Sequence, residues 1–198
     1  MAAPEPHRPL SIRLINAIGR ILSRLDLSVP SLDEEALLRA AAKQTNLDDF
    51  GPGGFRPGLQ RLLESLEHDA GLTTIGRLFT RGQIVGLLAN RLMLIDHQKR
   101  HPELAHEQIS RPLFVLGLPR TGTSILHALL AQDPTRRSPL AWEVNFPCPP
   151  PERATYDTDP RIERTDRQLD QLRKLAPGFD AIHPMEARLP QECVAIFT

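Results

Sequence analysis

The chain has 198 residues, of which 40% are hydrophobic and 24% are charged. This is the composition of a globular protein and excludes a disordered or fibrous one. The 24 lysines and arginines balance the 24 aspartates and glutamates, so the net charge gives no reason to expect a nucleic-acid or membrane-surface partner. Any anion site must therefore depend on a local group of residues.

The two cysteines, Cys148 and Cys193, have no metal-ligand spacing and form no disulfide framework. We therefore expect no metal site and a location in the reducing cytoplasm. No apolar run approaches the roughly 20 residues that span a bilayer, and the first residues lack the continuous apolar segment of a secretory signal. The sequence thus predicts no membrane span, and it leaves the oligomeric state open.

The first hundred residues carry helical periodicity of apolar side chains. It predicts helices over residues 9–26, 31–43, 59–66 and 74–99. The first is amphipathic, with Arg13 and Arg20 on the polar side, and we interpret it as an ordinary surface helix. Glycines and prolines in residues 48–58 predict a loop between the second and third helices. Residues 1–110 are accordingly assigned to a helical N-terminal region.

The pattern changes beyond residue 110. Residues 112–116 form a short apolar run followed by glycine, which predicts a buried strand. Residues 122–132 and 159–175 have helical spacing. Seven prolines between residues 133 and 160 predict little regular structure there. Residues 111–198 are therefore expected to form part of an α/β domain.

A strand, a glycine-containing loop and a helix are expected in succession within LFVLGLPRTGTSILHALL, residues 113–130. Gly117 and Gly122 have the spacing of a P-loop, in which backbone N–H groups point at a phosphate-like anion on a helix N-terminus. Ser124 stands where a Walker A motif has serine or threonine, but Thr123 replaces the motif's lysine. This replacement counts against a nucleoside triphosphatase.

Arg120 supplies positive charge within the loop, and its planar guanidinium suits bidentate contact with phosphate or sulfate oxygens. With the motif PRTGTS, residues 112–143 resemble the sulfotransferase family, in particular its bacterial and tyrosylprotein-sulfotransferase-like branches. In that family the motif [PR]-x-[ST]-G-[ST]-[ST] binds the 5'-phosphosulfate of the donor, 3'-phosphoadenosine 5'-phosphosulfate (PAPS). The resemblance implies an α/β P-loop fold with a parallel sheet. The donor-binding residues that it implies are Pro119, Arg120, Thr121, Gly122, Thr123 and Ser124.

The resemblance also implies a general base. In the resembling enzymes a glutamate beyond the loop helix deprotonates the acceptor, and Glu143 occupies that place. Such a base is needed because a neutral hydroxyl is a poor nucleophile. The alternative is that Glu143 is a solvated loop residue. His183 is the lesser candidate, since histidine is the base in the cytosolic branch. We interpret Trp142 as a packing residue, and Arg136 and Arg137 as solvated.

These residues favour transfer of a sulfuryl group from PAPS to a hydroxyl or amine acceptor. The acceptor is a small molecule or another compound that carries such a group. One alternative is a noncatalytic, truncated P-loop protein that binds an anion or nucleotide, and a less favoured one is a P-loop kinase. The residues that hold the donor's 3'-phosphate in the family are not found in this sequence. We therefore expect the chain to be the N-terminal part of a longer enzyme, whose acceptor the sequence does not identify.

Overall fold

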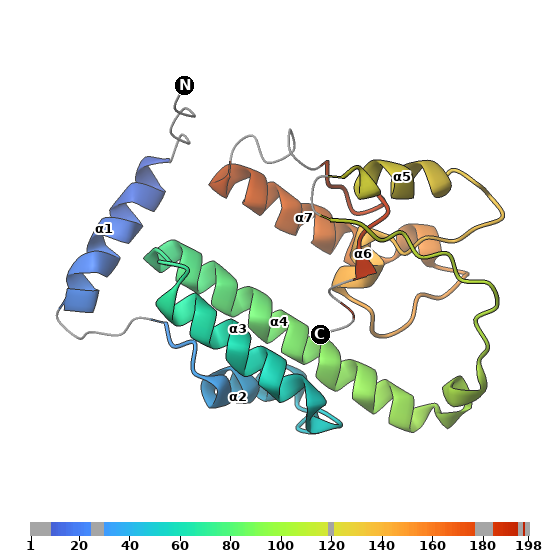
Figure 1. The fold of residues 1–198 in the computed structure, drawn as a ribbon, viewed down its shortest axis with the longest axis horizontal. Helices are drawn as coiled ribbons and strands as arrows, with labels where there is room; N and C mark the ends of the chain where they lie inside the picture. The colour runs from blue at the N-terminus through green and yellow to red at the C-terminus, as the bar shows by residue number, and fades with distance from the viewer. Residues whose placement is uncertain (1–8, 25–29, 119–120, 177–183, 194–195, 197–198) are drawn as a thin grey trace.

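The computed structural model describes residues 9–24, 30–118, 121–176, 184–193 and 196 (Figure 1). Regular structure within these residues is helical. None of the described helices is long and apolar enough to cross a bilayer.

The N-terminal half is a group of helices arranged around one long member. Its helices are α1 (Leu10–Arg24), α2 (Glu34–Thr45), α3 (Arg56–His68) and α4 (Thr74–Arg100). Two short 3-10 helices accompany them: η1 (Gly53–Phe55) lies between α2 and α3, and η2 (Pro102–His106) follows α4. Figure 1 shows α2 and α3 lying along α4. All four predicted helices of this half are confirmed, with ends that differ by a few residues.

The core of this half lies where α2, α3 and α4 meet. Apolar side chains recur three and four residues apart on each helix, so burying one face of each creates a shared interior. The buried residues are Leu32, Leu37, Leu38, Ala41, Leu63, Ile84, Leu88, Ala89 and Leu92.

Side chains cap the helices of this core. The Asp33 carboxylate accepts a hydrogen bond of 2.9 Å from the Ala36 N–H and thereby caps α2. Asn46 ends the same helix in the left-handed conformation, with φ of 57°. The Thr73 hydroxyl accepts from the Gly76 N–H and caps α4. These caps satisfy backbone groups that a helix end leaves without partners, and α4 begins at Thr74, as the apolar spacing predicts.

The C-terminal half is less regular. It contains α5 (Thr123–Leu130), α6 (Ala141–Asn145), the 3-10 helix η3 (Tyr156–Thr158) and α7 (Pro160–Leu175). The helices predicted over residues 122–132 and 159–175 are confirmed as α5 and α7. The segment expected to have little regular structure contains only the short helix α6 and η3, which confirms that prediction. The helix α6 forms because Glu143 caps its own first turn, accepting a hydrogen bond of 2.8 Å from the Leu140 N–H.

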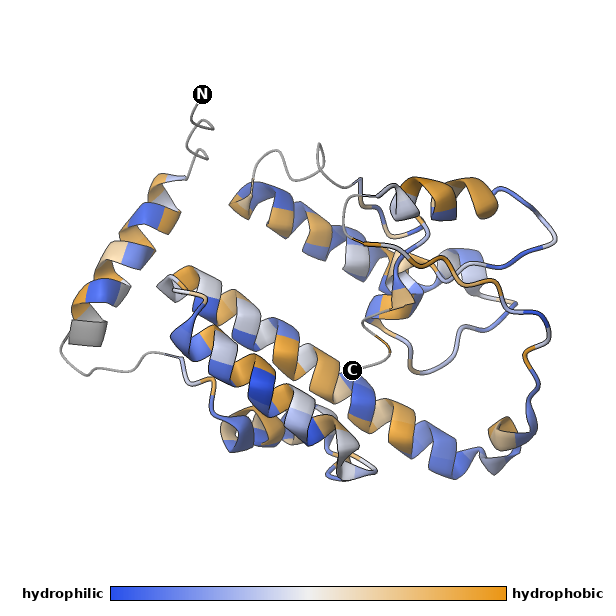
Figure 2. Cartoon of the chain, in the orientation of Figure 1, coloured by the Kyte–Doolittle hydropathy of each residue, from blue (hydrophilic) through white to orange (hydrophobic). Residues whose placement is uncertain are grey.

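The structure does not bear out the buried strand predicted over residues 112–116. These residues are irregular and pair with no other described segment. Phe114 is 71% exposed and Leu116 is 87% exposed; Figure 2 shows this apolar run in orange. A buried parallel strand needs a neighbouring strand to satisfy its backbone, and the described residues supply only one isolated antiparallel bridge, between Leu140 and Pro190. The predicted parallel sheet is therefore not formed among them.

Hydrogen bonds attach α6 to both halves of the chain. The buried Asn90 side chain, on α4, donates a hydrogen bond of 2.9 Å to the carbonyl of Asn145 at the end of α6. At the other end, the N–H groups of Ala141 and Trp142 donate to the carbonyls of residues 189 and 187. The short helix is thus held between the long helix α4 and the C-terminal segment.

Candidate functional site

The first part of the candidate site is the turn that leads into α5. Gly117 has no room for a side chain, because an added Cβ would lie 2.7 Å from Thr123 Cγ2 and 2.8 Å from Thr121 Oγ1. Gly122 has φ of +92°, a conformation that glycine adopts without strain. The Thr121 hydroxyl donates a hydrogen bond of 2.7 Å to the Leu118 carbonyl and closes the turn. Gly122 is therefore favoured by its backbone conformation, and Gly117 by the close approach of the Thr121 and Thr123 side chains.

The N-terminus of α5 is open. Gly122 is its N-cap residue and no side chain caps the helix, so its first N–H groups lack partners within the helix. Free N–H groups at a helix N-terminus attract phosphate and sulfate groups. Thr123 and Ser124 bring two hydroxyls to the same first turn. This arrangement can bind a phosphate or sulfate group. Pro119 and Arg120 lie outside the described residues.

The second part of the site is α6, which carries Glu143. The carboxylate is buried, with 6% of the residue exposed. One of its oxygens accepts from the Leu140 N–H, and the other accepts from the guanidinium of Arg137. The alternative that Glu143 is a solvated loop residue is therefore wrong. The Arg137 side chain is largely exposed, as predicted, but it also pairs with this buried carboxylate. No hydrogen bond or ion pair connects Glu143 with the described loop residues 121–124.

Tyr156, the chain's single tyrosine, lies beside this ion pair. Burial raises the pKa of its hydroxyl above the ordinary value, and the negative charge of Glu143 adds to this effect. A hydrogen bond with Glu143 also raises the pKa of Tyr156, whereas the charge and hydrogen bonding of Arg137 lower it by a smaller amount. At neutral pH the hydroxyl therefore keeps its proton and can donate it in a hydrogen bond.

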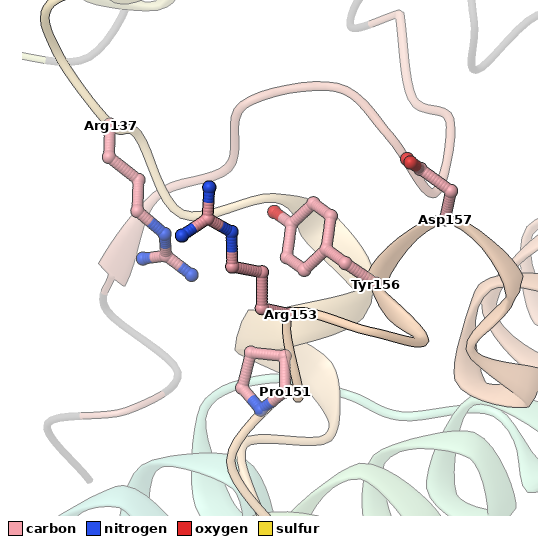
Figure 3. Close-up of a pocket in the computed structure, with 5 residues that line it drawn as sticks. All are labelled: Arg137, Pro151, Arg153, Tyr156 and Asp157. Atoms are coloured by element: carbon pink, nitrogen blue, oxygen red, sulfur yellow. The ribbon is translucent and has the colours of Figure 1, made fainter.

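A cavity of about 480 Å³ opens next to these groups (Figure 3). Its lining residues are Arg137, Pro151, Arg153, Tyr156 and Asp157. Figure 3 shows the guanidinium groups of Arg137 and Arg153 and the hydroxyl of Tyr156 directed toward one another. The cavity thus places hydrogen-bond donors next to the Glu143 carboxylate.

Arg161 connects the segments that surround this cavity. Its guanidinium forms an ion pair of 2.6 Å with Asp159, and donates to the carbonyls of Phe146 and Pro149. The same guanidinium lies 4.8 Å from the centre of the Trp142 ring. It connects the start of α7 to the end of α6 and to the proline-rich segment.

Trp142 is fully buried. Its ring meets the ring of Tyr156 edge to face, with 5.4 Å between their centres. The prediction that it is a packing residue is confirmed. Because it touches both Tyr156 and Arg161, it also fixes the position of one wall of the cavity.

Sequence reasoning missed Tyr156, Arg153 and Arg161. Each lies in or after the proline-rich segment, where no periodicity predicts which residues face the same side. The only signal was Asp159 followed by proline, a helix start, which would have placed Arg161 in the first turn of α7. His183 lies outside the described residues. Among the residues described, no group of three or more histidines, cysteines or acidic residues could hold a metal ion.

The chain is similar to known sulfotransferases in both sequence and structure. Residues 112–198 match the sulfotransferase family. No curated protein matches the chain. Two solved structures are similar. One is the sulfotransferase STF1 from Mycobacterium tuberculosis H37Rv, with 35% identity and a TM-score of 0.71 over 82% of this chain. The other is the sulfotransferase STF9 from Mycobacterium avium, with 31% identity and a TM-score of 0.70 over 84% of this chain.

The chain spans less than half of both relatives, 45% of the STF1 chain and 43% of the STF9 chain. The matched parts nevertheless include the glycine turn, α5 and α6, because the family match runs from residue 112 to residue 198. The similarity in structure extends further and takes in most of the chain. The chain belongs to the sulfotransferase family.

Proposed function

We propose that the complete protein transfers a sulfuryl group from PAPS to the hydroxyl or amine group of an acceptor. The observation that carries this proposal is the tight glycine turn that opens onto the uncapped N-terminus of α5 within the family match. Family membership supports the choice of PAPS as the donor, and the replacement of the Walker lysine by Thr123 argues against nucleoside triphosphate chemistry.

In this proposal the loop from Pro119 to Ser124 binds the 5'-phosphosulfate. The N–H groups at the start of α5 and the hydroxyls of Thr123 and Ser124 contact its oxygens, and Arg120 neutralises their charge. Residues 112–116, which are irregular here, become a strand of a parallel sheet in the complete enzyme, and residues 111–198 form the first part of its P-loop domain. No metal takes part.

Glu143 is the proposed general base. It takes the proton of the acceptor hydroxyl as the acceptor oxygen bonds to sulfur. The bond between sulfur and the phosphate oxygen breaks, and 3'-phosphoadenosine 5'-phosphate leaves with the electron pair. The acceptor enters through the cavity beside Arg137 and Tyr156, which supplies donors to hold it. Arg137 orients the carboxylate in the resting protein and must release one oxygen for the reaction.

Two further expectations belong to this proposal. The acceptor is a small molecule or another hydroxyl-bearing compound, and the protein works in the cytoplasm. His183 remains the alternative base. A noncatalytic P-loop protein is the second candidate function, because Glu143 is engaged by Arg137 and a second half of the fold is needed to complete the site.

Calorimetry on the complete protein tests the proposal. We expect 3'-phosphoadenosine 5'-phosphate to bind more tightly than ATP, and Arg120→Ala to weaken this binding roughly tenfold or more, because a charge-assisted contact is lost. Arg167→Ala, on the exposed side of α7, is the matched control and should bind normally. Tighter binding of ATP would support a P-loop kinase. Donor binding with no transfer of labelled sulfate to any hydroxyl or amine acceptor would support the noncatalytic candidate.

A further inference from the structure

Only one side of α1 is covered by the rest of the described protein. On that side Ile12 is buried, and the Asn16 side chain accepts a hydrogen bond of 3.0 Å from the Ile75 N–H at the start of α4. Gly19 lies so close to Thr74 that an added Cβ would meet its hydroxyl at 1.9 Å. These contacts fix which face of the helix is directed toward α4.

The opposite side of α1 is apolar and exposed. Leu10 is 79% exposed, Leu14 is 62%, Ile18 is 48% and Ile21 is 58%. Their spacing of four, four and three residues aligns them in one stripe along the helix. Figure 1 shows α1 at the edge of the molecule, and Figure 2 shows orange segments along it. No described residue covers this stripe.

Two positively charged side chains lie beside this apolar stripe. Arg13 and Arg20 are exposed and, being seven residues apart, lie on the same side of α1, next to the stripe. No aspartate or glutamate occurs anywhere in the sequence of the helix, LSIRLINAIGRILSR. This one-sided charge contrasts with the overall neutrality of the chain.

We propose that the exposed face of α1 binds an anionic membrane surface, with the helix lying in the plane of the interface. The apolar stripe enters the boundary between headgroups and acyl chains, and Arg13 and Arg20 contact lipid phosphates, as in amphipathic helices that bind membranes. A second copy of the chain fits this face less well. Two α1 helices meeting through the same stripe would bring like-charged arginines together with no carboxylate on either helix to pair with them.

The geometry of the attachment is compatible with the fold. The buried side of α1 holds the helix on the first turn of α4, so the lipid-facing side is directed away from the protein. A helix of this length is about 22 Å long, too short to cross a bilayer but long enough to lie on its surface. The inference goes beyond the proposed function and does not depend on it.

Vesicle flotation of the full chain tests the inference. Vesicles of phosphatidylcholine mixed with phosphatidylglycerol should carry at least roughly tenfold more protein than vesicles of phosphatidylcholine alone, and high salt should reduce the difference. The double variant Leu14→Glu with Ile18→Glu should abolish flotation. The matched control is Ile109→Glu, a substitution of an isoleucine that is 85% exposed outside α1, and it should float normally.

A charge variant separates the two contributions. Arg13→Glu with Arg20→Glu keeps the apolar stripe and should remove the preference for anionic vesicles. Circular dichroism should show unchanged helicity in both double variants, since all four positions are exposed. Equal flotation with neutral vesicles, or flotation unaffected by the α1 variants, would overturn the inference. So would a wild-type dimer in sedimentation that the apolar variant dissociates, because the stripe would then bind a second copy.

Discussion

Arg137 and Glu143 form an ion pair between an exposed and a buried side chain. The exposed fraction of the side-chain surface is 65% for Arg137 and 7% for Glu143. The same carboxylate caps α6 through the Leu140 N–H. Glu143 therefore shapes the short helix and is also the proposed base. A useful test must separate these two roles.

Glu143→Gln provides this separation. The glutamine carbonyl can still accept from the Leu140 N–H, so α6 should persist, but the side chain can no longer take a proton from the acceptor. We expect turnover by the complete protein to fall about a hundredfold to ten-thousandfold. The affinity for 3'-phosphoadenosine 5'-phosphate, measured by calorimetry, should stay nearly unchanged because the loop holds the donor.

The matched control is Glu163→Gln, which changes an exposed glutamate on α7 and should leave turnover unchanged. The outcome that contradicts the assignment is specific. If Glu143→Gln keeps near-normal turnover and His183→Ala abolishes it, the histidine is the base.

Gly117→Ala tests whether the glycine turn is needed for donor binding. The new methyl group would lie 2.7 Å from Thr123 Cγ2 and 2.8 Å from Thr121 Oγ1, so these two threonine side chains must shift from their places in the turn. We expect roughly tenfold or greater loss of affinity for 3'-phosphoadenosine 5'-phosphate, equivalent to about 1.4 kcal/mol. Calorimetry on the complete protein measures this loss.

Gly58→Ala is the matched control. Gly58 lies in α3 and has open space around its Cα, so alanine there should raise the free energy of unfolding by about 0.5–1 kcal/mol and leave binding unchanged. Normal binding by Gly117→Ala would mean that the turn does not contact the donor.

Asn90→Ala tests the attachment of α6 to the helical half. The Asn90 side chain is buried and donates to the Asn145 carbonyl, so alanine leaves that carbonyl without its donor. We expect the free energy of unfolding to fall by about 1–3 kcal/mol, and hydrogen exchange to increase in α6. A loss of stability without faster exchange in α6 would show that Asn90 stabilises only the helical core.

The parts of the fold that could be predicted are those set by local sequence. The apolar spacing along α4 acts within a few residues, so the position of the helix follows from it. The predicted strand at residues 112–116 failed because a strand depends on partners remote in sequence. The glycine turn was predictable because its constraints are local: Gly122 has φ of +92°, and Gly117 is crowded by the side chains of Thr121 and Thr123 a few residues away.

The remainder of the candidate site depends on contacts between distant segments. Glu143 was identified through the family resemblance, but its ion pair with Arg137 follows from the fold of α6, which a proline-rich sequence does not indicate. Tyr156 and Arg161 reach the same region from beyond the prolines. Their convergence requires the three-dimensional path of the chain, which the order of residues alone does not reveal.

Asp159→Asn tests the ion pair that supports the cavity. Hydrogen bonding to Arg161 lowers the pKa of Asp159 below its ordinary value of 3.8. The unfolded chain therefore binds the proton more readily than the folded protein, so this carboxylate stabilises the fold above pH 3.8 and loses its effect as the pH falls below that value. Asparagine keeps the oxygen that accepts from the Arg161 N–H at the start of α7, but it loses the charge. At pH 7 we expect the variant to be less stable by about 1 kcal/mol. The difference in the free energy of unfolding between the two proteins should shrink as the pH is lowered below 3.8, and urea unfolding at a series of pH values measures it.

The control is Asp170→Asn, at an exposed carboxylate on α7, which should change the free energy of unfolding by less than about 0.5 kcal/mol at pH 7. A stability difference for Asp159→Asn that stays constant from pH 7 to the acid range would show that the charge on Asp159 is not what stabilises the junction between α6 and α7.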